Sequence, residues 1–226
     1  MKLAYCAAAV VAALLATASA STASAQDVSF NAAVTSDYVF RGFSQTDEEP
    51  ALQLGVDVTF ESGFYAGAWA SNVDFGDDTD AEVDVYGGYR TEAGGFGLDF
   101  GVVGYVYVND PSGADYSYFE LKAAASRAIG PVTLGGAVYY SPDFFGADEA
   151  ATYVETNIAY APISKLTLSA AIGYQYLDVN EDYGTWNAGA AYAITDNIVI
   201  DARYHGSEID GPLSDDRAVG TLKFLF

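Results

Sequence analysis

The sequence has very little cysteine and few basic residues. Its 226 residues include one cysteine, Cys6, and one histidine, and 9 Lys and Arg stand against 31 Asp and Glu, for a formal net charge of -22. Contacts to phosphate groups need a basic surface, so this balance excludes nucleic acid as a partner. Cys6 lies in an N-terminal segment that we expect to be removed. The mature chain would then have no disulfide and no thiol chemistry.

Long apolar helices are also missing. No segment has the i, i+3, i+4, i+7 spacing of an amphipathic helix, and the apolar run of residues 7–18 is shorter than the ~20 residues that cross a membrane. That run follows Lys2 and precedes Ala23-Ser24-Ala25, which is an A-x-A cleavage site. Residues 1–25 are therefore predicted to be a cleaved signal peptide for export, and residues 26–226 a single domain.

Alternation with period two fills the rest of the chain, which is 51% hydrophobic and 15% aromatic in composition. In residues 52–61, Leu52, Leu54 and Val56 fall on one face, with Asp57 on the other. This spacing is typical of β-strands with one apolar face. It predicts twelve strands, at about 28–41, 51–61, 64–74, 81–90, 96–108, 116–126, 132–142, 151–161, 166–177, 184–194, 198–207 and 217–226.

The connections alternate between long acidic loops and short turns. The hairpins repeat every ~33–36 residues, as in an up-and-down meander. A soluble β-protein would place the apolar face inside, whereas a membrane barrel places it outside. The opposite face carries charged and aromatic residues, which suit a polar lumen, so we predict an all-β fold: one transmembrane antiparallel barrel of about 12 strands in the bacterial outer membrane. For strand 64–74 the pattern does not decide whether Phe64 or Trp69 points outward.

Aromatic residues near the strand ends fit the girdles of such a barrel. They are Tyr38, Phe40, Phe60, Tyr89, Phe96, Tyr116, Tyr140, Tyr160, Tyr176 and Tyr192. In the last strand, Leu222, Phe224 and Phe226 alternate outward. This pattern resembles the signal that the barrel-assembly machinery recognises, and the alternative is an ordinary last strand of a soluble sheet.

Four motifs carry a family resemblance: SDYVFRGFSQT, PALQLGVD, GFYAGAWASNV and EVDVYGGY, between residues 36 and 89. With them the chain resembles the TorF porin family, also called Gcw_chp. The resemblance extends through the mature chain. It implies a proteobacterial, Gram-negative outer-membrane barrel that forms a pore, and it supplies no substrate and no catalytic residues.

Catalytic and metal-binding patterns are absent or weak. His205, Ser207 and Glu208 are the residue types of a hydrolase triad, but Glu208 faces away from the other two along one strand. The acidic run of residues 74–80 lacks the spacing of a calcium loop. We therefore predict no enzyme, no metal and no cofactor, with outer-membrane lipid and lipopolysaccharide as surroundings.

A porin-like channel for passive diffusion of ions or small solutes is the leading prediction for function. The alternatives are a non-conducting structural or surface-binding barrel and, less favoured, an enzyme acting on lipid. Arg41 is expected to face the lumen and to pair with a wall carboxylate such as Asp57. With eight lumen acids against six bases, a pore should prefer cations. The candidate pore-lining residues are Asp37, Arg41, Asp57, Glu82, Asp84, Asp99, Tyr105, Tyr107, Glu120, Lys122, Glu155, Asp201 and Arg203.

Overall fold

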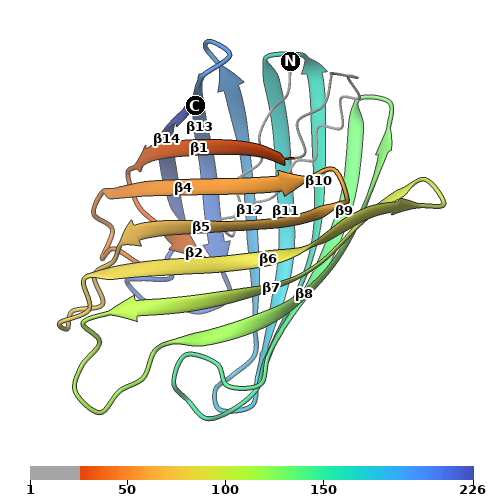
Figure 1. The fold of residues 1–226 in the computed structure, drawn as a ribbon. Coiled ribbons are helices and arrows are strands. Elements are labelled where there is room, and N and C mark those ends of the chain that lie inside the picture. Colours follow the sequence, from red (N-terminus) through yellow and green to blue (C-terminus); the bar gives the residue numbers. More distant parts are fainter. Residues whose placement is uncertain (1–25) are drawn as a thin grey trace.

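The computed structural model describes residues 26–226, so the predicted signal peptide lies outside the described residues. Twelve antiparallel strands close into one barrel in the order β1-β14-β13-β12-β11-β10-β9-β8-β7-β6-β5-β4 (Figure 1). The predicted all-β barrel of about 12 strands is confirmed. Its strands are β1 (Gln26–Thr35), β4 (Ala51–Phe60), β5 (Phe64–Asn72), β6 (Ala81–Ala93), β7 (Phe96–Val108), β8 (Tyr118–Ile129), β9 (Val132–Ser141), β10 (Ala151–Ile163), β11 (Leu166–Leu177), β12 (Tyr183–Ala193), β13 (Ile198–Ser207) and β14 (Arg217–Leu225).

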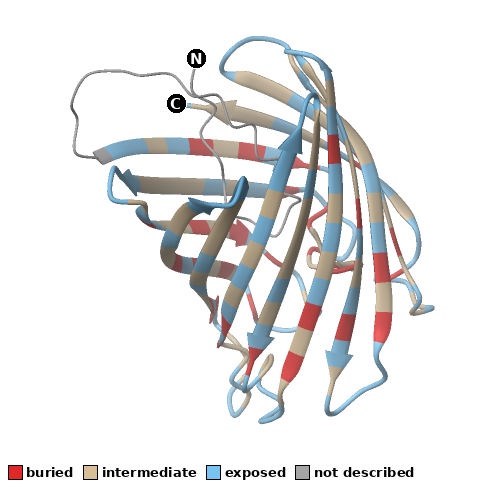
Figure 2. Cartoon of the chain, turned by 90° about the vertical axis from the view of Figure 1, so that its right-hand side faces the viewer, coloured by how far each residue is buried: buried red, intermediate tan, exposed pale blue. Residues whose placement is uncertain are grey.

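Large apolar side chains cover the outside of the barrel. Among the described residues, 37 large hydrophobic side chains are exposed, and bands of exposed and less exposed residues alternate along the strands (Figure 2). In β5 the structure shows which aromatic residue points outward, because Phe64 is 58% exposed and Trp69 only 3%. The same alternation turns charged and tyrosine side chains inward, since successive residues of a strand point to opposite faces.

The two ends of the barrel differ in their connections. Short turns at residues 61–63, 94–95, 130–131, 164–165 and 194–197 form one end, which we call the turn end. Longer connections at residues 73–80, 109–117, 142–150, 178–182 and 208–216 form the loop end, together with residues 36–50. β1 begins and β14 ends at the turn end. No helix that could span a bilayer occurs in the described part of the chain.

Residues 36–50 fold into the barrel and are called the inner hairpin. They contain two short strands, β2 (Val39–Phe40) and β3 (Phe43–Ser44), which pair only with each other. The predicted strand 28–41 is therefore wrong beyond Thr35. Arg41 and Gly42 have left-handed φ values of 47° and 88°, which make the tight turn between β2 and β3.

This inward course corrects the predicted aromatic girdle. Tyr38 is buried and Phe40 half-buried inside the barrel, while Tyr116 lies on the connection between β7 and β8. The other seven girdle residues are exposed on the outer face: Phe60, Tyr89, Phe96, Tyr140, Tyr160, Tyr176 and Tyr192.

Candidate pore interior

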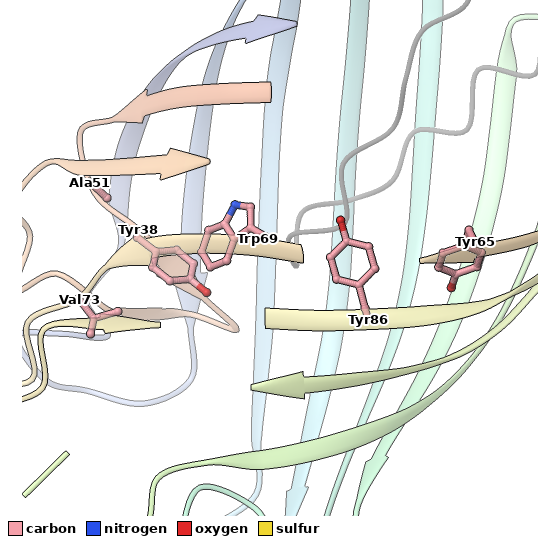
Figure 3. Close-up of a cluster of buried hydrophobic side chains, with 6 residues drawn as sticks. All are labelled: Tyr38, Ala51, Tyr65, Trp69, Val73 and Tyr86. Carbon is pink, nitrogen blue, oxygen red and sulfur yellow. The ribbon is translucent and has the colours of Figure 1, made fainter. Parts of the chain in front are cut away.

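The loop-end half of the barrel interior is filled with side chains. Tyr38 of the inner hairpin packs edge-on against Trp69 of β5, with ring centroids 5.2 Å apart (Figure 3). Farther round the wall, Tyr105 and Tyr118 stack with centroids 4.4 Å apart, and Phe40 of the hairpin lies 5.9 Å from Tyr105. Tyr38, Trp69, Tyr105 and Tyr118 are all buried, so aromatic side chains obstruct this half of the lumen.

Arg41 at the tip of the inner hairpin makes a bidentate ion pair with the barrel wall. Its two terminal nitrogens each donate to one oxygen of Glu120 on β8, both at 2.7 Å. One of them also donates to Gln175 Oε1 on β11, at 3.0 Å. Paired, parallel bonds of this kind are stronger and more specific than single ones. Arg41 pairs with a wall carboxylate as expected, but the partner is Glu120 and not Asp57, because the hairpin carries Arg41 across the lumen to the far wall.

A second ion pair fixes the base of the inner hairpin. Asp37 accepts from Arg217 of β14 at 3.0 Å, and its other oxygen accepts from Ser44 and Thr46 within the hairpin. Arg217 also approaches Glu48 at 3.3 Å. The hairpin is thus attached to the wall at its base as well as at its tip.

Between the hairpin and the turn end, the interior opens into a cavity of about 380 Å³, which we call the lower cavity. Val39, Arg41 and Gly42 form its roof, and its lining reaches Thr91 and Gly97 near the turn end. Polar side chains from β6, β7, β8, β10 and β12 project into it. A cavity of this volume has room for a small polar solute.

Basic and acidic groups share the wall of the lower cavity. Asp99 of β7 accepts from Lys122 at 2.9 Å, from Arg90 at 3.2 Å and from Tyr65 at 2.7 Å. The Arg90 guanidinium lies 3.9 Å from the centre of the Tyr65 ring. Two cations meet one carboxylate here, so this patch has a net charge of about +1.

Other carboxylates inside the barrel have no basic partner. Asp57 accepts from Tyr86 at 2.7 Å through one oxygen, while its other oxygen is buried without a hydrogen bond, as is one oxygen of Asp84. Glu82 accepts from Tyr38 at 2.9 Å, and Glu155 from Asn157 at 3.2 Å. Counted as formal charges, these groups give the interior its surplus of acids over bases.

The structure places every candidate pore-lining residue inside the barrel, on an inward strand position or on the inner hairpin. Asp37 and Arg41 lie on the hairpin, and the other eleven lie on strands β4, β6, β7, β8, β10 and β13. Arg203 of β13 bonds to Asn187, Ser169 and Asp201, at 2.7, 2.9 and 3.2 Å. The contact that Gln175 makes with the hairpin was missed. The alternation along β11 indicates that Gln175 faces inward, but the sequence does not show that Arg41 is its partner.

The triad-like residues do not form a catalytic site. His205 lines the lower cavity. Ser207 donates to the backbone oxygen of Ile209 at 3.4 Å, and Glu208 accepts from the backbone of Gly184 at 2.8 Å. In residues 26–226, no three His, Cys, Asp or Glu side chains are arranged to hold a metal ion.

Comparison with known protein families gives a match over most of the chain. A family model described as "Bacterial protein of unknown function (Gcw_chp)" matches residues 19–223. No curated protein matches by sequence.

Similar solved structures are outer-membrane barrels. The KdgM porin superposes with a TM-score of 0.62 at 10% identity, over 88% of this chain and 98% of that one. The NanC porin gives 0.58 at 11% identity, over the same shares. An outer membrane channel from Pseudomonas putida F1 gives 0.55 at 9% identity, over 91% of this chain and 96% of that one. At such low identity these likenesses show a common fold.

Proposed function

The chain belongs to the Gcw_chp family of bacterial proteins, and from its interior we propose that it is an outer-membrane channel for passive diffusion of ions and small polar solutes. The porin role implied by the resemblance to TorF proteins is part of this proposal. His205 has no catalytic role in it. Outer-membrane lipid and lipopolysaccharide surround the barrel, and the assembly machinery recognises Leu222, Phe224 and Phe226.

The observation that carries the proposal is the inverted distribution of side chains. The outside is apolar, with residues such as Leu54, Phe100 and Ile172 more than half exposed, and the inside is charged. Soluble proteins rarely expose such continuous apolar surface. Alternation of apolar-out and polar-in over strands of this length is the pattern of outer-membrane barrels, which export through a signal peptide would deliver to their membrane.

Cation preference follows from the interior charges. Eight carboxylates face six basic groups: Asp37, Asp57, Glu82, Asp84, Asp99, Glu120, Glu155 and Asp201 against Arg41, Arg90, Lys122, Arg203, Arg217 and Lys223. Four of the acids, Asp57, Glu82, Asp84 and Glu155, have no salt bridge to a basic group. Rings of acidic side chains favour cations in narrow pores, so the channel should pass cations more readily than anions.

A non-conducting barrel is the second candidate, and the packed loop-end half favours it. Gln175 and Ser141 are completely buried there, and Gln175 is bonded to Arg41 of the inner hairpin. If the hairpin never leaves, the lower cavity is a closed pocket and the barrel serves structure or surface binding. The two candidates differ in whether the hairpin moves.

Conductance of the purified protein in planar lipid bilayers separates these candidates. The native chain is compared with a variant whose residues 37–49 are replaced by a short Gly-Ser linker. A channel with a mobile hairpin conducts in both forms, and more strongly in the shortened one. Conductance in the shortened form alone supports the non-conducting barrel, and its absence in both forms rules out the channel.

A further inference from the structure

We propose that the wall site that holds Arg41 is a binding site for solutes that carry a guanidinium group. It consists of Glu120, Gln175, Tyr139 and Tyr153, and we call it the guanidinium cage. Arg41 occupies it as a built-in substitute for such a solute. This inference rests on the proposed channel, because it names a class of solute that the channel would take.

The polar part of the cage fits a planar, forked cation. Glu120 offers both carboxylate oxygens, each 2.7 Å from one terminal nitrogen of Arg41, and Gln175 Oε1 accepts a third bond at 3.0 Å. Glu120 is 1% exposed and Gln175 is fully buried. Tyr105 donates to Glu120 at 3.0 Å and holds the carboxylate in place. A guanidinium matches this geometry with two parallel bonds, which a compact ammonium cannot make.

The aromatic part of the cage adds a second form of cation recognition. The guanidinium carbon of Arg41 lies 4.4 Å from the ring centre of Tyr153 and 5.3 Å from that of Tyr139. Cations within about 6 Å of an aromatic face are attracted by the charge distribution of the ring. A neutral molecule of the same shape would lose this attraction as well as the charge of Glu120.

The cage belongs to the wall and does not depend on the hairpin for its shape. Tyr139 on β9 is the register partner of Tyr153 on β10, and Tyr153 is the partner of Gln175 on β11. If Arg41 leaves, the backbone ladder still holds these side chains side by side. Glu120 would then be a lumen carboxylate that has lost its cationic partner. The empty cage therefore favours the entry of another cation.

The aromatic side of the cage borders the lower cavity, and a solute reaches the buried Glu120 and Gln175 only after Arg41 moves away. Arg41, Tyr139 and Tyr153 all line that cavity. Arg41 is tethered by a short segment, and tethered groups act at effective concentrations in the millimolar range. A free solute therefore competes when it is abundant, and it binds much better when Arg41 is absent.

The test measures binding of methylguanidinium by calorimetry in detergent. Arg41→Ala should bind it at least tenfold more tightly than the native protein, and Arg41→Ala/Glu120→Gln should lose that gain. Methylurea, a neutral analogue of similar shape, and methylammonium should bind tenfold or more weakly to Arg41→Ala. Arg127→Ala, which removes an exposed arginine that lies over Phe96 on the outer face, should behave like the native protein. Equal binding of methylurea, or no gain in Arg41→Ala, overturns the inference.

The native chain supplies a readout that needs no variant. Trypsin cleaves after arginine, and Arg41 is buried in its cage. Methylguanidinium should displace Arg41 and speed cleavage after it, measured by mass spectrometry, while methylurea at equal concentration should not. Cleavage after the exposed Arg127 is the internal control. Protection of Arg41 that does not change with methylguanidinium contradicts the inference.

The bilayer recordings keep this inference separate from the proposed function. Conductance without guanidinium binding would support the proposed channel and contradict the proposed guanidinium cage. Binding of methylguanidinium without conductance in the native or the shortened form would support the guanidinium cage and contradict the channel.

Discussion

Arg41 combines an unusual backbone with a buried charge. Its φ of 47° lies in the left-handed region, which few residues other than glycine adopt, and its side chain is 4% exposed. Glu120, at 1% exposure, supplies the opposite charge. Removing one partner of a buried pair is far more costly than replacing both with apolar groups. The attachment of the inner hairpin therefore depends on both residues.

Glu120→Gln should release the inner hairpin. It leaves Arg41 buried without a counter-charge, at a cost of about 3–5 kcal/mol. Protection of Arg41 against trypsin should then fall by about two orders of magnitude or more. Arg41→Met/Glu120→Met is the control for the barrel, whose free energy of unfolding should stay close to the native value. Unchanged tryptic protection in Glu120→Gln would show that the ion pair does not hold the hairpin.

Sequence parity predicts which residues face inward, but not which of them meet. Asp57, Glu120 and Asp201 all lie on the predicted face, because a period of two assigns each strand residue to one side. The partner of Arg41 could not be found in this way. Glu120 is 79 residues away in the chain and Gln175 is 134 residues away, and only the closed barrel brings them together.

Among the elements, the inner hairpin is the one that the alternation pattern misassigns. Residues 36–41 continue the alternation of apolar and polar residues in β1, so the pattern predicts that they extend that strand. The chain leaves the wall after Thr35, whose hydroxyl donates to the backbone oxygen of Asp37 at 2.9 Å. Inside a polar lumen a hairpin can carry the same alternation as a wall strand. The pattern therefore did not distinguish the two.

Gly42→Ala tests how tightly the tip of the hairpin fits its wall. A Cβ at Gly42, where φ is +88°, would lie 2.7 Å from Ser207 Cβ. Both the left-handed backbone and this clash should weaken docking, with a cost of ~1–2 kcal/mol from the backbone alone. Faster tryptic cleavage after Arg41 is the expected result.

Gly113→Ala is the matched control for this change. Its φ is +93°, but a Cβ there would meet nothing within 4 Å. It should cost a similar backbone strain and leave the cleavage rate after Arg41 unchanged. If the two variants give the same rate, the tip does not press against the wall.

A substitution on strand β7 tests whether the outward face of the barrel contacts lipid. Val102 lies at the middle of Phe96–Val108 and is 44% exposed. Val102→Arg should lower the free energy of unfolding in lipid vesicles by roughly 2–4 kcal/mol, because it places a charge near the bilayer midplane. Ala124→Arg adds the same side chain toward the lower cavity and should cost less. A harmless Val102→Arg in vesicles would mean that this face does not contact hydrocarbon.

Across the whole molecule, negative charge gathers inside the barrel and at the loop end. The interior has eight acids against six bases, and Asp47, Glu48 and Glu49 lie exposed on the hairpin. Salt screens the loop end strongly, since the Debye length is ~10 Å at 0.1 M. The interior groups are confined and less screened. Cation preference should therefore weaken as salt concentration rises, without vanishing.

The central claim is that the barrel interior is a path for cations that the inner hairpin obstructs. Reversal potentials across a KCl gradient test it most directly, recorded in planar bilayers for the native protein and for the variant with residues 37–49 replaced. We predict potentials of the cation-selective sign in both, larger at low salt than at high salt, with higher conductance in the shortened form. Potentials of the anion-selective sign at low salt, or no current in either form, would contradict it.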